Sequence, residues 1–126
     1  TVRQTFKMFG DDRIILISDS MEATGMPDGE YALGGQKVIK KGNVATLEDG
    51  TIAGSATNLM DCLRIAVQKM QIPLESAVKC AAVNPARSVG IYDRYGSITP
   101  GKTANLVLLK EEDLSTVQVI LKGKCI

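Results

Sequence analysis

The stretch that decides the fold is residues 13–20, Arg-Ile-Ile-Leu-Ile-Ser-Asp-Ser. A short run of consecutive apolar, mostly β-branched residues is typical of a strand buried on both faces in a parallel sheet covered by helices. The run ends at Ser18-Asp19-Ser20, so polar side chains stand at the carboxyl end of the predicted strand. Ligands bind at that end in α/β sheets and barrels. The sequence therefore predicts an α/β fold with a candidate site at Asp19.

The residues on either side of this run predict a helix end and a small antiparallel sheet. Residues 1–9, TVRQTFKMF, have apolar side chains near helical spacing. Residues 21–29 contain glycine and proline and are expected to form a loop. From Glu30 to Ile52 the chain alternates short strand-like runs with turns. Asp49-Gly50 is a two-residue hairpin signal, because both turn positions favour a positive φ angle.

A helical period replaces the strand pattern after Gly54-Ser55. Apolar residues from Leu59 to Met70 follow helical spacing, and Thr57 or Asn58 can cap the start of this helix. A second helix is expected to begin at Pro73 and to break at Asn84-Pro85. The rest of the chain predicts one more short helical turn and then strands, at residues 86–89, 105–109 and 116–121.

The composition is that of a globular protein without a nucleic-acid or membrane partner. Of the 126 residues, 44% are hydrophobic and 23% are charged, and the net charge is +1. The charges are scattered, which argues against a nucleic-acid surface, and no apolar run is long enough to span a membrane. Three cysteines without CxxC spacing and no visible signal peptide predict a reducing cytoplasm. A start at Thr1, inside a helical pattern, suggests a fragment or a processed chain.

The absence of histidine limits the chemistry that this chain can perform. Histidine is the commonest metal ligand and the usual acid or base near neutral pH. Hydrolysis by this chain would therefore rest on carboxylates, thiols or hydroxyls. Cys62 and Cys80 lie on apolar helix faces and are expected to be inert core thiols. Asp19 is the best candidate for a general acid or base, although a carboxylate here can equally cap a turn.

Residues 51–57, between the last insertion strand and the first long helix, could approach a ligand closely. Gly54 permits close backbone approach, and a helix N-terminus favours anions and polar oxygens. An ordinary capped turn explains the same pattern. Isolated basic residues could bind phosphate but are more often solvated; they are Lys37, Lys40, Arg87 and Arg94.

Taken together, several sequence blocks resemble the N-acetylglucosamine-6-phosphate deacetylases of the amidohydrolase superfamily. Two blocks are particular to the deacetylases, namely residues 26–31 with Gly34-Gly35, and residues 47–55, LEDGTIAGS. The strand block 15–19 and the tail blocks 84–87 and 96–102 are shared more widely among amidohydrolases. The resemblance covers nearly the whole chain. It departs from the pattern at Ser20, where the family usually has alanine, and at Asn105, where it usually has aspartate.

The resemblance implies a fold, a division of the chain and a set of site residues. The fold would be the C-terminal fragment of a metal-dependent-hydrolase (β/α)8 barrel, with a β-hairpin insertion and part of a small β-sandwich domain. Residues 1–90, including the insertion 30–52, would belong to the barrel, and residues 91–126 to the β domain. Asp19 would be the catalytic residue, and Ile52, Ala53 and Gly54 would line the sugar pocket.

The family's metal ligands, a glutamate and two histidines, have no match in this chain. The resemblance implies a divalent metal, zinc or iron, in the full-length enzyme, and a homodimer that binds an amino-sugar phosphate. The metal would activate water, and Asp19 would take the water's proton and return it to the departing amine. For the 126 residues alone we expect no bound metal, no deacetylase activity, and self-association through the unpaired strand.

Two alternatives remain open at this point. The shared tail also fits another amidohydrolase, such as a cyclic amidase or a deaminase. The missing histidines also fit a non-catalytic structural or interaction fragment.

Overall fold

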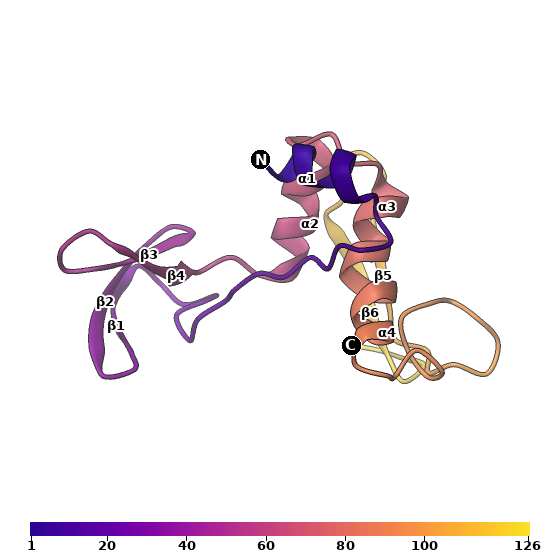
Figure 1. Ribbon diagram of the computed structural model, residues 1–126. Helices are drawn as coiled ribbons and strands as arrows, with labels where there is room; N and C mark the ends of the chain where they lie inside the picture. The colour runs from indigo at the N-terminus through magenta and orange to yellow at the C-terminus, as the bar shows by residue number, and fades with distance from the viewer. The chain divides into compact units, whose positions relative to one another are not determined.

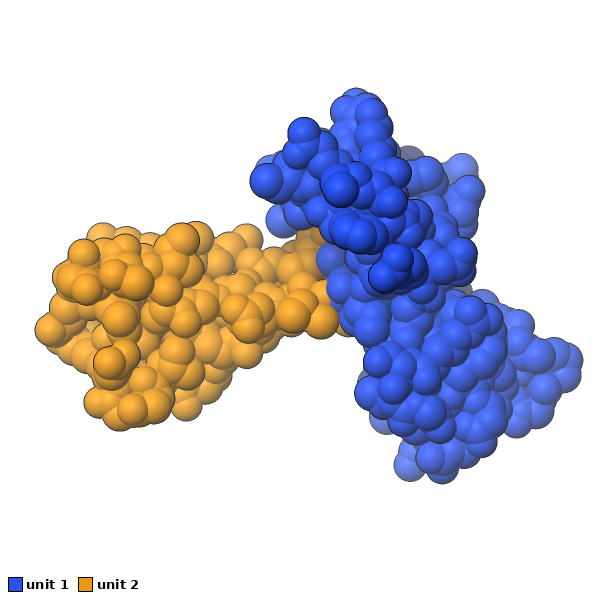
Figure 2. Space-filling view, in the orientation of Figure 1, with its two compact units in different colours: residues 1–16, 63–126 blue, residues 17–62 orange.

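The computed structural model describes residues 1–126 and divides into two compact units (Figure 1, Figure 2). One unit comprises residues 17–62, and the other comprises residues 1–16 together with residues 63–126. Each unit has its own antiparallel sheet. None of the helices combines the length and the apolar composition that crossing a membrane requires. The predicted division at residues 90 and 91 separates a barrel part from a β domain on the basis of the family resemblance. These compact units do not test it, so it stays a prediction.

Residues 17–62 form a four-stranded antiparallel meander, in which each strand pairs with the next one along the chain. Its strands are β1 (Gly29–Leu33), β2 (Gln36–Lys41), β3 (Val44–Leu47) and β4 (Ile52–Ser55). The predicted antiparallel structure between Glu30 and Ile52 is confirmed. A small core holds the sheet against the preceding loop and consists of Met21, Ala23, Val38 and Ala45.

Two of the turns show how glycine sets the register of this sheet. Gly34 and Gly35 both have positive φ angles, +57° and +83°, as a two-residue hairpin turn of this hand requires. The prediction of a two-residue turn at Asp49-Gly50 is wrong, because only Gly50 takes a positive φ. Asp49 instead accepts the Thr51 N–H through its carboxylate at 2.9 Å. The loop therefore has three residues and closes with a hydrogen bond from Leu47 N–H to Thr51 O of 2.8 Å.

The second unit contains most of the helical residues. They form α1 (Val2–Phe9), α2 (Leu59–Gln68, of which Leu63 onward belongs to this unit), α3 (Leu74–Val78), the π-helical turn η1 (Lys79–Val83) and α4 (Asn84–Ser88). Of the two predicted capping residues, Thr57 and Asn58, it is Asn58 that caps α2. Its Oδ1 accepts the Asp61 N–H at 2.9 Å, and its amide donates to the Asp61 carboxylate at 2.7 Å.

The prediction that Asn84-Pro85 breaks the second helix is wrong. The chain stays helical from Leu74 to Ser88, with η1 between α3 and α4. Proline lacks an N–H and cannot complete an ordinary helical hydrogen bond. A π turn widens the helix locally, so the helix passes Pro85 without ending.

The C-terminal sheet follows the predicted order. Its strands, β5 (Leu106–Leu109), β6 (Thr116–Leu121) and β7 (Lys124–Cys125), are antiparallel and adjacent along the chain. Asn105 lies just before β5 and accepts the Lys122 N–H through Oδ1 at 2.9 Å. Because an aspartate oxygen can accept the same bond, the departure from the family pattern at Asn105 leaves this turn unchanged.

Residues 13–17, which the sequence predicts to be a buried strand, form no strand: Arg13 lies in a turn and residues 14–17 pair with no other strand, so that prediction is wrong for this chain. Ile15 is 41% exposed and Ile17 is 69% exposed. A strand buried on both faces needs a neighbouring strand and covering helices, and the chain supplies no neighbouring strand to residues 14–17. The first ladder contact comes only at Ser20, which forms an isolated parallel bridge with Ser55.

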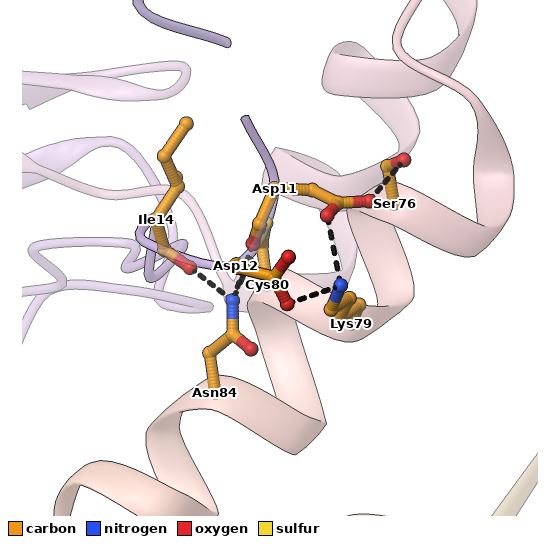
Figure 3. Close-up of polar contacts among 7 residues, drawn as sticks. All are labelled: Asp11, Asp12, Ile14, Ser76, Lys79, Cys80 and Asn84. Carbon is orange, nitrogen blue, oxygen red and sulfur yellow. Dashed lines mark hydrogen bonds and ion pairs between the residues drawn. The ribbon is translucent and has the colours of Figure 1, made fainter. Parts of the chain in front are cut away.

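The start of this extended segment is anchored to the helix that contains the π turn (Figure 3). The buried Asn84 amide donates to two backbone carbonyls, Asp11 O at 2.6 Å and Ile14 O at 2.7 Å. The N–H of Leu16 donates to the carbonyl of Cys80 at 2.9 Å. The helix therefore satisfies backbone groups that a neighbouring strand would otherwise bind.

A small ionic network reinforces this anchor. Lys79 Nζ lies 2.8 Å from the Asp11 carboxylate and 2.6 Å from that of Asp12 (Figure 3). The Ser76 hydroxyl also donates to Asp11 at 2.7 Å. The hydrogen bonds from Lys79 and then from Ser76 lower the pKa of Asp11 below its ordinary 3.8. Hydrogen bonds to Asp11 and Asp12 raise the pKa of Lys79.

The lowered pKa of Asp11 predicts a specific loss of stability in acid. The ionised carboxylate contributes its full stabilisation above the unfolded-state pKa, and the contribution is lost as the pH falls through the lower folded-state pKa. We expect Asp11→Asn to flatten the pH dependence of the unfolding free energy between about pH 5 and pH 2. Urea titrations across this range measure it, with Asp93→Asn as the control because Asp93 is exposed and has no ion pair. Equal pH dependence in Asp11→Asn and the unsubstituted chain would contradict the prediction.

Candidate functional site

Asp19 lies at the end of the extended segment, in the unit formed by residues 17–62. Its φ angle is +50°, in the left-handed region that residues other than glycine rarely adopt. Holding such a residue there costs about 1–3 kcal/mol and requires support from the surroundings. The residue is exposed. The carboxylate makes no hydrogen bond or ion pair within the chain, so it is available to a ligand.

The support for the Asp19 backbone comes from β4. Ser55 N–H donates to Asp19 O at 3.2 Å, and Met21 N–H donates to Ser55 O at 3.0 Å. These two bonds form the parallel bridge between Ser20 and Ser55. The structure therefore brings Asp19 beside the end of β4, which contains the sequence-predicted residues 52–54.

Gly54, the residue before Ser55, also lies against the segment that contains Asp19 and Met21. A Cβ atom built at Gly54 would lie 3.8 Å from Met21 Sδ and 4.0 Å from Asp19 O. These are ordinary contact distances, so alanine fits and a larger side chain would press on the Asp19 backbone. Ala53 packs against the Met21 cluster, whereas Ile52 is 73% exposed. That Ile52, Ala53 and Gly54 bind a sugar stays a prediction.

The loop that follows Asp19 is fixed by Asp28 and Lys40, which the sequence did not identify as a pair. The Asp28 carboxylate accepts the Gly42 N–H at 2.9 Å and the Lys40 ammonium at 3.2 Å. The Gly42 bond first, and then Lys40, lower the pKa of Asp28. The Tyr31 hydroxyl donates to Pro27 O at 2.7 Å. The deacetylase-like block 26–31 is thus held by side chains within its own unit.

The other basic candidates for phosphate binding are also engaged. Lys40 is occupied by Asp28, and its side chain is only 8% exposed. Lys37 pairs with Glu30 at 2.8 Å. Arg87 and Arg94 stack over tyrosine rings, those of Tyr92 and Tyr95 respectively. None of these cations is a free phosphate ligand in this chain.

Of the two thiols predicted to lie in the core, Cys80 is buried and Cys62 is half-buried. Burial, more than any nearby charge, raises the pKa of Cys62 and of Cys80. A raised pKa keeps a thiol protonated and weakly nucleophilic. Cys80 is fully buried and points its Sγ toward Asp11 O at 3.4 Å, so its role is packing.

A metal ion does not fit the residues of this chain. The chain has no histidine, and no group of three or more Cys, Asp or Glu side chains lies close enough together to hold a metal. Asp19 is separated from any second potential ligand. The chain therefore contains a candidate proton carrier without a metal centre.

The sequence showed Ser18 and Ser20 beside Asp19, but sequence reasoning missed the contact of Ser20 with Thr57. Ser20 Oγ lies 2.7 Å from Ser18 Oγ and donates to Thr57 O at 2.7 Å. The only signal in the sequence was the serine at position 20 in place of the family's usual alanine. A contact across 37 residues cannot be found from local spacing.

The candidate site thus consists of Asp19 beside β4, the strand that contains Gly54. The amidohydrolase family profile matches residues 18–126, and the chain belongs to that family. Similarity to solved deacetylases confirms the fold class predicted for this chain. That class is part of a barrel-type metal-dependent hydrolase with an antiparallel insertion.

The particular relatives are amino-sugar phosphate deacetylases. An N-acetylglucosamine-6-phosphate deacetylase of Bacillus subtilis is 38% identical over 114 residues, covering 90% of this chain and 28% of the relative. An N-acetylgalactosamine-6-phosphate deacetylase of Escherichia coli O157:H7 is 36% identical over 113 residues, covering 90% of this chain and 30% of the relative. A Mycobacterium smegmatis N-acetyl-D-glucosamine-6-phosphate deacetylase variant, solved with N-acetyl-D-glucosamine-6-phosphate, is 36% identical with a TM-score of 0.89. That similarity covers 98% of this chain and 33% of the solved chain. The chain thus spans less than a third of the length of the B. subtilis and E. coli O157:H7 relatives.

Proposed function

We propose that this chain is part of a hydrolase that converts N-acetylglucosamine 6-phosphate into glucosamine 6-phosphate and acetate, in the cytoplasm. The observation that carries the proposal is the position of Asp19, an exposed residue with a positive φ angle. Its backbone is hydrogen-bonded to Ser55 in β4, the strand that ends the LEDGTIAGS block. The B. subtilis relative and the M. smegmatis structure support this substrate by their names. Because the E. coli relative is named for the galactosamine epimer, the substrate panel must include both sugars.

In this proposal Asp19 moves the proton. Its carboxylate, free of partners within the chain, accepts a proton from the attacking water and passes it to the amine that leaves. One carboxylate serves both steps because it is regenerated in each turnover. Ile52, Ala53 and Gly54 would lie along the sugar, where Gly54 allows its backbone to come close.

The remaining parts of the active site belong to residues outside this chain. They include the ligands of a divalent metal, zinc or iron, and the groups that hold the sugar phosphate. We further propose that the complete enzyme is a homodimer. Support for these parts comes from family membership and from the lack of a fitting cluster within the 126 residues.

The alternatives are less well supported. A cyclic amidase or a deaminase would share the tail blocks, but the reported relatives with 36–38% identity act, by their names, on acetylated amino-sugar phosphates. A non-catalytic fragment gives no role to the exposed carboxylate of Asp19 at its positive φ angle. A substrate panel on the complete enzyme distinguishes the three possibilities.

The acid–base role of Asp19 predicts the effect of Asp19→Asn in the complete enzyme. We expect turnover to fall by about 10²–10⁴-fold at unchanged metal content. Asparagine keeps the shape of the side chain but can neither accept nor release a proton near neutral pH. Steady-state kinetics and metal analysis measure the two quantities, with the exposed Asp93→Asn as the matched control. Turnover within about tenfold of the unsubstituted enzyme would contradict the role.

The unpaired segment before Asp19 predicts that the isolated chain self-associates. Between Arg13 and Ser18 the only backbone hydrogen bonds are those of Leu16 N–H and Ile14 O, and Ile15 and Ile17 are exposed. Such an edge offers both backbone groups and apolar surface to a second copy. Light scattering over a concentration series should show mass above that of a monomer, and Ile17→Lys should lower it. A strict monomer at the highest concentration would contradict this prediction.

A further inference from the structure

We infer that Asn84, which directly follows the π turn η1, is a positioning residue for Asp19. The inference rests on the proposed function of Asp19 as a proton carrier. Asn84 acts through the backbone of residues 11–16, which lead along the chain to Asp19.

The side-chain amide of Asn84 has two N–H bonds, and both are used on one turn of backbone (Figure 3). They donate to Asp11 O at 2.6 Å and to Ile14 O at 2.7 Å. Asn84 is buried, and a buried polar group that loses its partner pays its full desolvation penalty. Because the two carbonyls are three residues apart, the amide fixes both ends of the turn that precedes residues 14–19.

The π turn supplies a third contact, through the carbonyl group of Cys80. In an α-helix this carbonyl would accept the N–H of the residue four positions later, which is Asn84. The Asn84 N–H instead donates to Lys79 O, five positions earlier. The next residue, Pro85, has no N–H. The carbonyl of Cys80 therefore lacks both of these helical donors, and it accepts the N–H of Leu16 at 2.9 Å.

Together, the Asn84 amide and the Cys80 carbonyl imitate one residue of a parallel strand. In a parallel pair, a residue of the neighbouring strand donates to one carbonyl and accepts the N–H that lies two residues further along. Ile14 O and Leu16 N–H are bound by the helix in this same pattern. The helix thereby fixes the register of this segment. A slip of one residue would turn each following side chain to the opposite side.

This register bears on Asp19 because the distance along the chain is short. Asp19 lies three residues after Leu16 and directly before Ser20, which forms the bridge with Ser55. The bridge fixes Asp19 from one end of the segment only, and the helix fixes the other end. Small displacements of a catalytic group reduce turnover strongly. We therefore expect the Asn84 contacts to affect kcat rather than substrate binding.

The test uses Asn84→Asp in the complete enzyme, with Lys79→Met as the matched control. Aspartate has the size of asparagine, but its ionised carboxylate donates no hydrogen bond to the two carbonyl oxygens. Lys79→Met, on the same helix, removes the ion pairs with Asp11 and Asp12 and leaves both carbonyl bonds in place.

Both variants are compared at a temperature at which they are folded. We expect Asn84→Asp to lower kcat about tenfold, with KM changed less than about twofold. Lys79→Met should keep kcat within about twofold of the unsubstituted enzyme. A kcat of Asn84→Asp equal to that of Lys79→Met would overturn the inference.

The pH dependence of kcat separates hydrogen-bond donation from packing. Burial and the two carbonyl oxygens raise the pKa of the introduced carboxyl group, whose protonated form can again donate one hydrogen bond. The ratio of kcat for Asn84→Asp to kcat for the unsubstituted enzyme should be highest at low pH and fall as the pH rises through that pKa. A ratio that does not change with pH would also overturn the inference. Groups present in both enzymes cancel in this ratio; the titratable and charged ones near Asn84 are Asp11, Asp12, Arg13, Lys79, Cys80 and Arg87.

A second variant keeps the inference testable if Asn84→Asp does not fold. Pro85→Ala restores a backbone N–H that can bind the Cys80 carbonyl in place of Leu16. We expect hydrogen exchange of the Leu16 amide to accelerate about tenfold or more, with kcat lowered in the same variant. Unchanged exchange or unchanged kcat in Pro85→Ala would contradict this. If Asp19→Asn is inactive and these variants keep kcat, this inference alone fails; if Asp19→Asn keeps its turnover, the proposed function fails with it.

Discussion

The parallel bridge between Ser20 and Ser55 is the contact on which the candidate site depends. It joins the end of the Asp19 segment to the end of β4, two stretches that are 35 positions apart in the sequence, by two backbone hydrogen bonds. The bridge holds Asp19 at a positive φ and places Gly54 against its backbone. The small core around Met21, Ala23, Val38 and Ala45 keeps the sheet in place behind it. Without this contact, Asp19 would be one exposed carboxylate among several.

The other end of the same segment is held by different chemistry. There the amide of Asn84 takes the place of a neighbouring strand and binds two carbonyls, while Lys79 forms ion pairs with Asp11 and Asp12. The π turn sets Asn84 in the first turn of a helix that has to pass Pro85. Between the two anchors, Ile15 and Ile17 remain exposed. A barrel strand without its neighbouring strands would likewise expose its apolar side chains between two fixed ends.

Local patterns predicted most of the elements. The bounds of β6, the cap at Asn58 and the Gly34-Gly35 turn follow from rules that involve only a few adjacent residues. The errors arose where the outcome depends on distant residues or on exact backbone geometry. The run at 14–17 has the composition of a buried strand, but burial depends on partners that the run itself does not specify. Pro85 does not end its helix, because the π turn before it accommodates a residue without a backbone N–H.

The sequence alone pointed to Asp19 as the candidate site residue, but not to the contacts that support it. Asp19 stands out because it follows an apolar run, and the family resemblance gave it a role. The hydrogen bond from Ser20 to Thr57 O joins residues 37 positions apart, and the Asp28–Lys40 pair joins residues 12 positions apart. No rule based on local sequence spacing connects such residues.

The central claim is that Asp19 is the proton carrier of a site completed by residues outside the chain. A crystal structure of the complete enzyme with its acetylated sugar phosphate tests this most directly. We expect an Asp19 carboxylate oxygen within about 3 Å of the amide nitrogen, or of a water molecule next to the acetyl carbonyl carbon. An Asp19 side chain directed away from the acetamide in that complex, with another acid or base in its place, would contradict it.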